Sequence, residues 1–221
     1  MAVTGLILAG GRGTRMGEAD KGLVELFGRP MVAHVAARLG PQVDRLLISA
    51  NRNPQAYAVH GTVVADDPAD GSAAGPLAGV AAALAAARSS WVVTVPCDAP
   101  FFPIDLVARL GAALGLGADP AAWPAAGSAT PHAEAFAPGQ RPRLAVARAG
   151  GRRQPVCMLL PTDLLDDLRG YLRGGGRRVA AWQNEAGVVE VDFPDESGFL
   201  NINTPADLSA AAARMAAYTS Q

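Results

Sequence analysis

Short apolar runs alternate with helical segments along the chain, and this alternation constrains the fold more than any other feature of the sequence. A few continuous apolar residues bounded by turn signals are typical of a strand that is buried on both faces. Repetition of strand and helix predicts an α/β fold, namely a three-layer, doubly wound and mostly parallel sheet with right-handed crossovers. In the first half we expect strands at Val3–Ala9, Arg45–Ser49, Thr62–Ala65 and Trp91–Val95, and helices at Pro30–Leu39, Pro76–Arg88 and Pro103–Leu114.

The second half resumes the same alternation after an interruption. Residues Gly117 to Pro142 are rich in Ala, Pro and Gly and show little periodicity, which predicts a flexible insertion. A length of 221 residues suits one large domain, so we expect a single domain over 1–221 that carries this insertion. Beyond it we expect strands at Leu144–Ala147, Val156–Leu160 and Val188–Phe193, and helices at Thr162–Leu172, Arg177–Gln183 and from Thr204 onward.

Composition excludes several classes of protein. The 19 basic and 20 acidic residues give a net charge of −1, which provides no field to hold a nucleic acid. Cys97 and Cys157 have neither CxxC nor zinc-site spacing, so we expect no disulfide framework and a reducing cytoplasm. The longest apolar stretch, Ala78 to Ala87, is about half of what a membrane-spanning helix requires, so we expect no membrane association.

The strongest local signal is the segment Leu8 to Gly17, directly after the first strand, followed by Asp20-Lys21-Gly22. Its glycines let backbone N–H groups approach an anion, and Arg15 and Lys21 add charged donors, so the segment predicts a triphosphate site. The spacing fits neither a dinucleotide fingerprint nor a P-loop, because Met16 and Leu23 stand where those motifs need Gly and Lys. The alternative is a glycine-rich turn with solvated arginines.

The second signal is the segment Pro96 to Phe101, at the end of an expected central strand. A carboxylate at this place, Asp98, is where a hard Mg²⁺ would be held while it bridges phosphate oxygens. The alternative is that Asp98 caps a turn or a helix before the proline. Cys97 has no basic sequence neighbour, which favours a small buried residue over a nucleophile.

Polar residues also follow other expected strands. Asn and Asp side chains can read a purine edge, and a glycine-rich helix start lets a flat base lie close, although each segment alone is also ordinary turn chemistry. The segments are Ser49 to Arg52, Asp66-Asp67 and Gly75 to Gly79.

Near the C-terminus, Arg177 and Arg178 are candidates for binding an acceptor phosphate, with solvated charge as the alternative. Asn201 and Asn203 alternate along an expected strand face, which would place both amides in the crevice. The segment Thr204 to Asp207 reads as a helix N-terminus, with Thr as cap and Pro at the first helical position.

Together these segments resemble the MobA family, the molybdenum cofactor guanylyltransferases, within the larger group of MobA-like NTP transferases. The resemblance implies a Rossmann-like nucleotidyltransferase fold and a Mg²⁺-dependent transfer of GMP from GTP to the phosphate of molybdopterin, with release of pyrophosphate. A single motif is weak evidence, but the ordered set is highly specific. It runs over nearly the whole chain as LAGGRGTRMGEADKG, PQVDRLLISANRN, GPLAG, VPCDAPFFP, GRRV and NINTPADL.

The resemblance also implies roles for individual residues. Lys21 would contact the phosphates, Asp98 would bind Mg²⁺, and Arg15 would join them in catalysis. Asn51 and Asp67 would fix the guanosine. With Gly79 from the glycine-rich helix start added, the expected nucleotide-binding residues are Leu8, Ala9, Gly10, Gly11, Lys21, Ser49, Asn51, Asp67, Gly79 and Asp98, and the expected acceptor-binding residues are Arg177, Arg178, Asn201 and Asn203.

Two features depart from the family pattern. Gln154-Pro155 stands where the family usually has His-Pro, and the insertion from Gly117 to Pro142 is longer than the pattern leads us to expect. Two other functions remain open: a related nucleotidyltransferase that uses CTP or a sugar phosphate, and a non-catalytic module that binds GTP or the cofactor and delivers it. The expected partners are GTP and molybdopterin or molybdenum cofactor, with molybdoenzyme chaperones and upstream cofactor-loading proteins as candidates.

Overall fold

A single mixed sheet forms the centre of the molecule. The computed structural model describes residues 2–9, 12–13, 19–70, 75–116, 131–132 and 142–219. The sheet has the strand order β7-β6-β1-β8-β11-β10-β12-β9. Its strands are β1 (Val3–Leu8), β6 (Arg45–Ser49), β7 (Thr62–Val64), β8 (Trp91–Pro96), β9 (Pro131–His132), β10 (Leu144–Ala149), β11 (Arg152–Pro161) and β12 (Val188–Phe193).

Most strands point in the same direction. β7, β6, β1 and β8 pair in parallel, as do β10 and β12. β11 runs antiparallel between β8 and β10, and β9 pairs antiparallel with β12 at the edge. Because β11 is antiparallel to both of its neighbours, β8 and β10 point the same way, so the carboxyl ends of six strands meet at one edge of the sheet.

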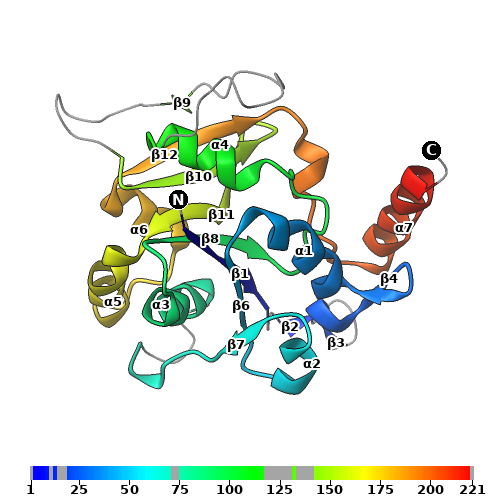
Figure 1. Cartoon of the computed structure of the whole chain (residues 1–221), viewed down its shortest axis with the longest axis horizontal. Coiled ribbons are helices and arrows are strands. Elements are labelled where there is room, and N and C mark those ends of the chain that lie inside the picture. Colours follow the sequence, from blue (N-terminus) through cyan, green and yellow to red (C-terminus); the bar gives the residue numbers. More distant parts are fainter. Residues whose placement is uncertain are drawn as a thin grey trace.

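Helices cover both faces of the sheet (Figure 1). α1 and α4 pack on one face, and α3, α5 and α6 pack on the other. Two small hairpins, β2–β3 and β4–β5, and the short helix α2 extend from the carboxyl edge of β1 and β6. The bounds are α1 (Met31–Leu39), α2 (Pro54–Ala58), α3 (Pro76–Ala86), α4 (Leu106–Ala113), α5 (Leu165–Arg173), α6 (Val179–Ala186), α7 (Pro205–Thr219), β2 (Arg12–Gly13), β3 (Ala19–Asp20), β4 (Glu25–Leu26) and β5 (Arg29–Pro30).

The buried side chains of the strands alternate between the two faces. In β1, Ile7 joins the cluster under α1 and α4, whereas Leu6 joins the cluster under α3, α5 and α6. On the face of α4, β10 presents only alanines, which let that helix lie close to the sheet. The continuous apolar runs of the sequence are therefore strands that are buried on both faces, as predicted.

The doubly wound, mostly parallel α/β fold is confirmed, and most element boundaries differ from the expected ones by one to three residues. α4 begins at Leu106 rather than Pro103, because the N–H of Leu106 bonds the carbonyl of Pro103 in a preceding turn, and α5 begins three residues later than expected, after a short 3-10 helix. β11 is longer than expected, since it extends back to Arg152 to pair with the end of β10. Within the expected insertion from Gly117 to Pro142, residues 117–130 and 133–141 lie outside the described residues.

Two helical glycines, one buried and one exposed, give a test of this packing. A Cβ on Gly79 in α3 would overlap Ser49 Oγ and lie 2.9 Å from Leu8 Cδ2, whereas a Cβ on Gly170 in α5 would meet nothing within 4 Å. We expect Gly79→Ala to lower the free energy of unfolding by about 1–3 kcal/mol through overpacking. Gly170→Ala should raise it by roughly 0.5–1 kcal/mol through helix propensity. Urea unfolding of both variants checks this, and equal effects would show that α3 does not pack tightly on β1 and β6.

Candidate functional site

The carboxyl ends of β1, β6 and β8 are held together by backbone hydrogen bonds that continue past the strands. The N–H of Ala9 donates to the carbonyl of Ser49 at 2.9 Å, and the N–H of Cys97 donates to the carbonyl of Leu8 at 3.0 Å. The segments that follow the three strands therefore leave the sheet at one edge. This is the edge at which ligands bind in open α/β sheets.

A cluster of three polar side chains lies at this edge. Lys21 Nζ is 3.2 Å from Asp98 Oδ2 and also donates to Asn203 Oδ1. The Lys21 and Asp98 side chains are only 19% and 12% exposed, so the charges are weakly screened by solvent. In a partly exposed pair of this kind, the cation can bind a phosphate instead of the carboxylate, and the carboxylate can bind a metal ion instead of the cation.

Asn203 reaches the cluster from the last connection of the chain. Asp207 Oδ2 accepts from the backbone N–H groups of Asn203 and Thr204 at 3.0 and 2.9 Å, and Thr204 Oγ1 accepts from the N–H of Asp207 at 3.1 Å. The bond from the Asn203 N–H is the main reason that the pKa of Asp207 lies below its usual value. The expected helix cap is confirmed, and it fixes the backbone from which Asn203 extends.

The expectation that Asn201 and Asn203 lie on a strand is wrong. Residues 201–203 have no regular structure, because the N–H of Ile202 bonds the carbonyl of Asp98 at 2.8 Å instead of a neighbouring strand. Ile202 is buried, and Asn203 contacts Lys21 whereas Asn201 is exposed.

The segment that carries Lys21 is fixed by residues that the sequence motifs did not single out. Tyr57 donates its hydroxyl to Asp20 Oδ1, and Asn53 Nδ2 donates to Asp20 Oδ2 at 3.1 Å. Tyr57 is fully buried, and burial with the bond to Asp20 raises the pKa of its hydroxyl. A Cβ on Gly22 would lie 2.5 Å from the Tyr57 hydroxyl oxygen, so the glycine that follows Lys21 is required for this contact.

Ser49 and Asn51 lie at the end of β6 and share one partner, Asp66. Asn51 Nδ2 donates to Asp66 Oδ2 at 2.7 Å, and the Asp66 N–H donates back to Asn51 Oδ1 at 3.0 Å. Ser49 Oγ is 3.5 Å from Asp66 Oδ1. The reciprocal bonds fix the Asn51 amide plane, and Gly79 of α3 lies against Ser49 and Leu8. Asp66 therefore fixes the orientation of Asn51, a contact that the sequence did not reveal.

Other candidate residues lie at the same edge without a direct contact to Lys21 or Asp98. Asp67 follows Asp66, and its carboxylate contacts the Ala69 N–H and Arg169. Arg177 donates to the carbonyl of Leu172 in the last turn of α5 and to that of Gly176 beside it.

Arg178 and Gln154 make only local contacts among the described residues. The backbone of Arg178 accepts from Tyr171, and Gln154 contacts the carbonyl of Arg152 at 3.5 Å. Gly10, Gly11 and Arg15 lie outside the described residues.

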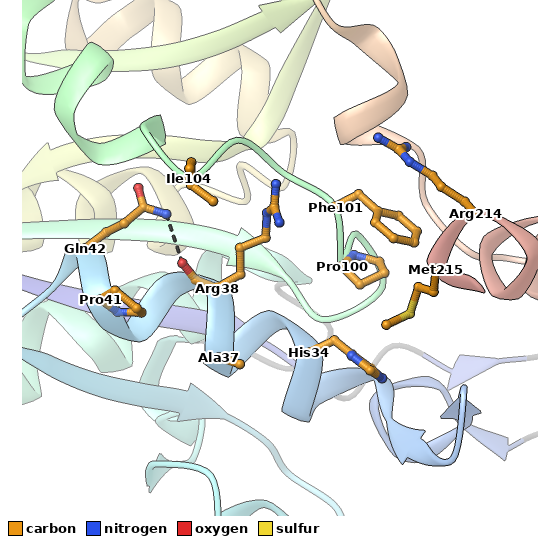
Figure 2. Close-up of a pocket in the computed structure, with 10 residues that line it drawn as sticks. All are labelled: His34, Ala37, Arg38, Pro41, Gln42, Pro100, Phe101, Ile104, Arg214 and Met215. Carbon is orange, nitrogen blue, oxygen red and sulfur yellow. Dashed lines mark hydrogen bonds between the residues drawn. The ribbon is translucent and has the colours of Figure 1, made fainter. Parts of the chain in front are cut away.

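A groove of about 710 Å³ lies beside the loop that follows Asp98, between α1 and α7. Figure 2 shows His34 and Arg38 of α1 opposite Arg214 and Met215 of α7, with Pro100 and Phe101 between them. None of Lys21, Asp98 and Asn203 lines this groove. Its walls instead brace the loop, since Arg38 Nε donates to the Phe102 carbonyl and the Arg214 guanidinium lies 4.5 Å from the centroid of the Phe101 ring.

Both cysteines are buried and unpaired. Burial is the main cause that raises the pKa of the Cys97 thiol, and the negative charge of Asp98 adds to it. The same two causes raise the pKa of Cys157 from 9.0 to about 12. Both residues are therefore neutral packing groups, as expected for Cys97, and neither is an activated nucleophile.

Comparison with known proteins gives one family. A family model described as the MobA-like NTP transferase domain matches residues 5–187. The chain is 44% identical over 204 residues to the molybdenum cofactor guanylyltransferase of Cupriavidus pinatubonensis, with 91% of this chain and 92% of the relative covered. It is 45% identical over 223 residues to the protein of the same name from Burkholderia ambifaria, with 96% and 97% covered.

Solved structures share the fold at lower identity. The molybdopterin-guanine dinucleotide biosynthesis protein A of Archaeoglobus fulgidus is 19% identical with a TM-score of 0.68, and 97% of this chain and 99% of that one are covered. The 2-C-methyl-D-erythritol 4-phosphate cytidylyltransferase of Thermus thermophilus is also 19% identical, with a TM-score of 0.65 and 98% and 100% covered. These similarities establish the nucleotidyltransferase-type fold.

The burial of the thiols predicts that they do not react in the folded protein. We expect no modification of either cysteine by Ellman's reagent at pH 8 within the time in which the unfolded chain reacts at both, because the reagent needs an accessible thiolate. The raised pKa of Cys157 implies that the neutral thiol stabilises the fold fully below about pH 9, and that this contribution is lost as the pH rises toward 12. Rapid reaction of one thiol in the native protein would contradict its placement in the core.

Proposed function

The chain belongs to the MobA-like NTP transferase family, and from this membership and the geometry of the site we propose that it transfers GMP from GTP to the terminal phosphate of molybdopterin. The observation that carries the proposal is the cluster of Lys21, Asp98 and Asn203 at the carboxyl edge of the sheet. It assembles a cation, a carboxylate and an amide at the place where a nucleotide phosphate binds in such folds.

In this function Lys21 moves from Asp98 to the phosphates of GTP. A phosphate oxygen of molybdopterin attacks the α-phosphorus, and pyrophosphate leaves. A phosphate monoester is already anionic, so the site needs no strong general base. Its task is to align two anions that repel each other, which is work for fixed charges and amides rather than for a proton acceptor.

We propose Mg²⁺ as the metal that assists this reaction, held by Asp98. No group of three His, Cys, Asp or Glu side chains that could hold a metal ion occurs among the described residues. One carboxylate at the phosphate site nevertheless fits Mg²⁺, which is commonly bound by one or two carboxylates together with substrate phosphates. When bound, the ion would neutralise charge on the phosphate oxygens.

The other assignments follow from position. Asn51 and Asp67 would contact the guanosine, with Ser49, Gly79, Leu8 and Ala9 around it, and Gly10, Gly11 and Arg15 would contact the phosphates. Asn203 would hold Lys21 in reach of both substrates. For the acceptor we propose Arg177, Arg178 and Asn201, which are exposed.

We also propose a cellular location and protein partners for the reaction. Among the residues that the structure describes, no helix has the length and hydrophobicity needed to cross a membrane. Two buried, unpaired cysteines are compatible with the reducing cytoplasm, where we place the reaction. Molybdoenzyme chaperones and upstream cofactor-loading proteins are the proposed protein partners.

Base preference separates this function from its nearest rival. The fold is shared with a cytidylyltransferase, so GTP and CTP must be compared directly. We expect pyrophosphate release from GTP that depends on molybdopterin, and at least about tenfold slower release from CTP, the discrimination that one unpaired polar group gives. Faster release with CTP would indicate a cytidylyltransferase. Binding of GTP without pyrophosphate release with any acceptor would indicate a non-catalytic delivery module.

Substitution of Asp98 tests the metal assignment. We expect Asp98→Asn to lower turnover by a factor on the order of a hundred or more, as for loss of a main electrostatic stabiliser, with a cooperative melt retained. Binding of Mn²⁺ in the presence of GTP, measured by electron paramagnetic resonance, should weaken in parallel. Asp105→Asn is the matched control, because Asp105 lies seven residues further on and pairs only loosely with Arg109 at 3.9 Å. Parental turnover in Asp98→Asn would remove the assignment.

A further inference from the structure

Arg169 joins α5 to the segment that follows β7. Its Nε lies 3.2 Å from Asp70 Oδ1, and its Nη2 lies 3.4 Å from Asp67 Oδ2. Asp67 and Asp70 are linked to each other as well, since the Asp70 N–H donates to the Asp67 carbonyl at 3.0 Å. One guanidinium therefore contacts both carboxylates of a single short turn, although about a hundred residues of sequence separate it from that turn.

Burial of Asp70 fixes the position of this guanidinium. The Asp70 side chain is only 3% exposed, and its Oδ2 has no hydrogen-bond partner among the residues that the structure describes. A buried carboxylate without a cation is strongly unfavourable, and Arg169 is the cation that the structure places beside it. Because the guanidinium is planar and rigid, fixing Nε on Asp70 also fixes where Nη2 can lie.

Asp67 is the exposed end of the same arrangement. Its Oδ2 faces Arg169 and its Oδ1 accepts from the Ala69 N–H at 2.9 Å, so the carboxylate plane is fixed from two sides. The side chain is still 45% exposed, which leaves lone pairs on both oxygens free to accept from a ligand. The single positive charge of Arg169 also offsets part of the negative charge of Asp67 and Asp70, which would otherwise repel a triphosphate at the neighbouring strand ends more strongly.

We propose that Arg169 is a positioning residue for the nucleotide, which holds the Asp67 carboxylate in the orientation that accepts hydrogen bonds from guanosine. The proposal rests on the proposed function, because it requires Asp67 to contact GTP. It predicts that Arg169 affects affinity for GTP and leaves the chemical step and the acceptor largely unaffected.

The experiment compares GTP binding by isothermal titration calorimetry, and KM and kcat for pyrophosphate release, in the parent and in Arg169→Gln. We expect the Kd and KM for GTP to rise about tenfold, the loss of one charge-assisted hydrogen bond, with kcat at saturating GTP and the KM for molybdopterin changed less than about twofold. Arg143→Gln is the matched control. Arg143 also pairs with two carboxylates, Asp163 just before α5 and Asp167 in its first turn, but both pairs are exposed.

Two further variants separate positioning from a purely structural role. If Arg169 acts through Asp67, Asp67→Asn should weaken GTP binding, and adding Arg169→Gln to it should have little further effect. Arg169→Lys keeps a cation for buried Asp70 but cannot contact both carboxylates with a rigid fork, so it should fold like the parent and bind GTP severalfold more weakly. If Arg169→Gln fails to fold, the Arg169→Lys variant tests the proposal in its place.

The outcomes are distinct. Parental affinity for GTP in Arg169→Lys and in any folded Arg169→Gln, or fully additive effects with Asp67→Asn, would overturn the positioning role while leaving the proposed function intact. A parent protein that does not bind GTP would overturn the proposed function and this inference with it. An equal loss in Arg143→Gln would show that α5 acts only through general stability, which also contradicts the proposal.

Discussion

The ion pair between Lys21 and Asp98 is the interaction on which the arrangement of this site depends. Lys21 follows the first strand and its glycine-rich loop, Asp98 follows β8, and Asn203, which receives a hydrogen bond from Lys21, precedes the last helix. Three distant parts of the chain therefore meet at one ammonium group. Because the side chains are mostly shielded from water, each charge is costly without the other, and the backbone around both must be held accurately.

That accuracy comes from neighbours that do not belong to the cluster. Tyr57 and Asn53 hold Asp20, the residue before Lys21, and the helix cap of α7 holds the backbone of Asn203. Arg38 holds the carbonyl of Phe102 in the loop after Asp98. Arg38 belongs to α1 on the sheet, whereas Tyr57 belongs to α2 at the carboxyl edge and the cap belongs to α7, which packs on β4. Elements on and beside the sheet therefore hold the polar edge through a few hydrogen bonds.

The sequence predicted most strands of the central sheet and the place of Lys21 and Asp98 near its carboxyl edge for physical reasons, and it missed their pairing and its supports for equally physical ones. Continuous apolar runs report burial on two faces, and a carboxylate or glycine loop after such a run must lie at the carboxyl edge. Contacts such as Asn51 with Asp66, or Arg169 with Asp67, depend on side chains brought together by tertiary structure, and no local pattern marks them. The expected strand at Asn201–Asn203 was wrong because alternation of side chains does not reveal whether a neighbouring strand is present to pair with.

The geometry of the central pair also limits how substrate can enter under the proposed function. If Lys21 left Asp98 for a phosphate with nothing in exchange, a shielded carboxylate would face a triphosphate without compensation, which electrostatics disfavours strongly. The exchange becomes favourable when a cation reaches Asp98 as the phosphate reaches Lys21. Nucleotide and metal would then bind as one unit, and the ion pair would keep the carboxylate compensated until they do. The positive charge of Lys21, which would bind the triphosphate, thus also stabilises the empty site by compensating Asp98.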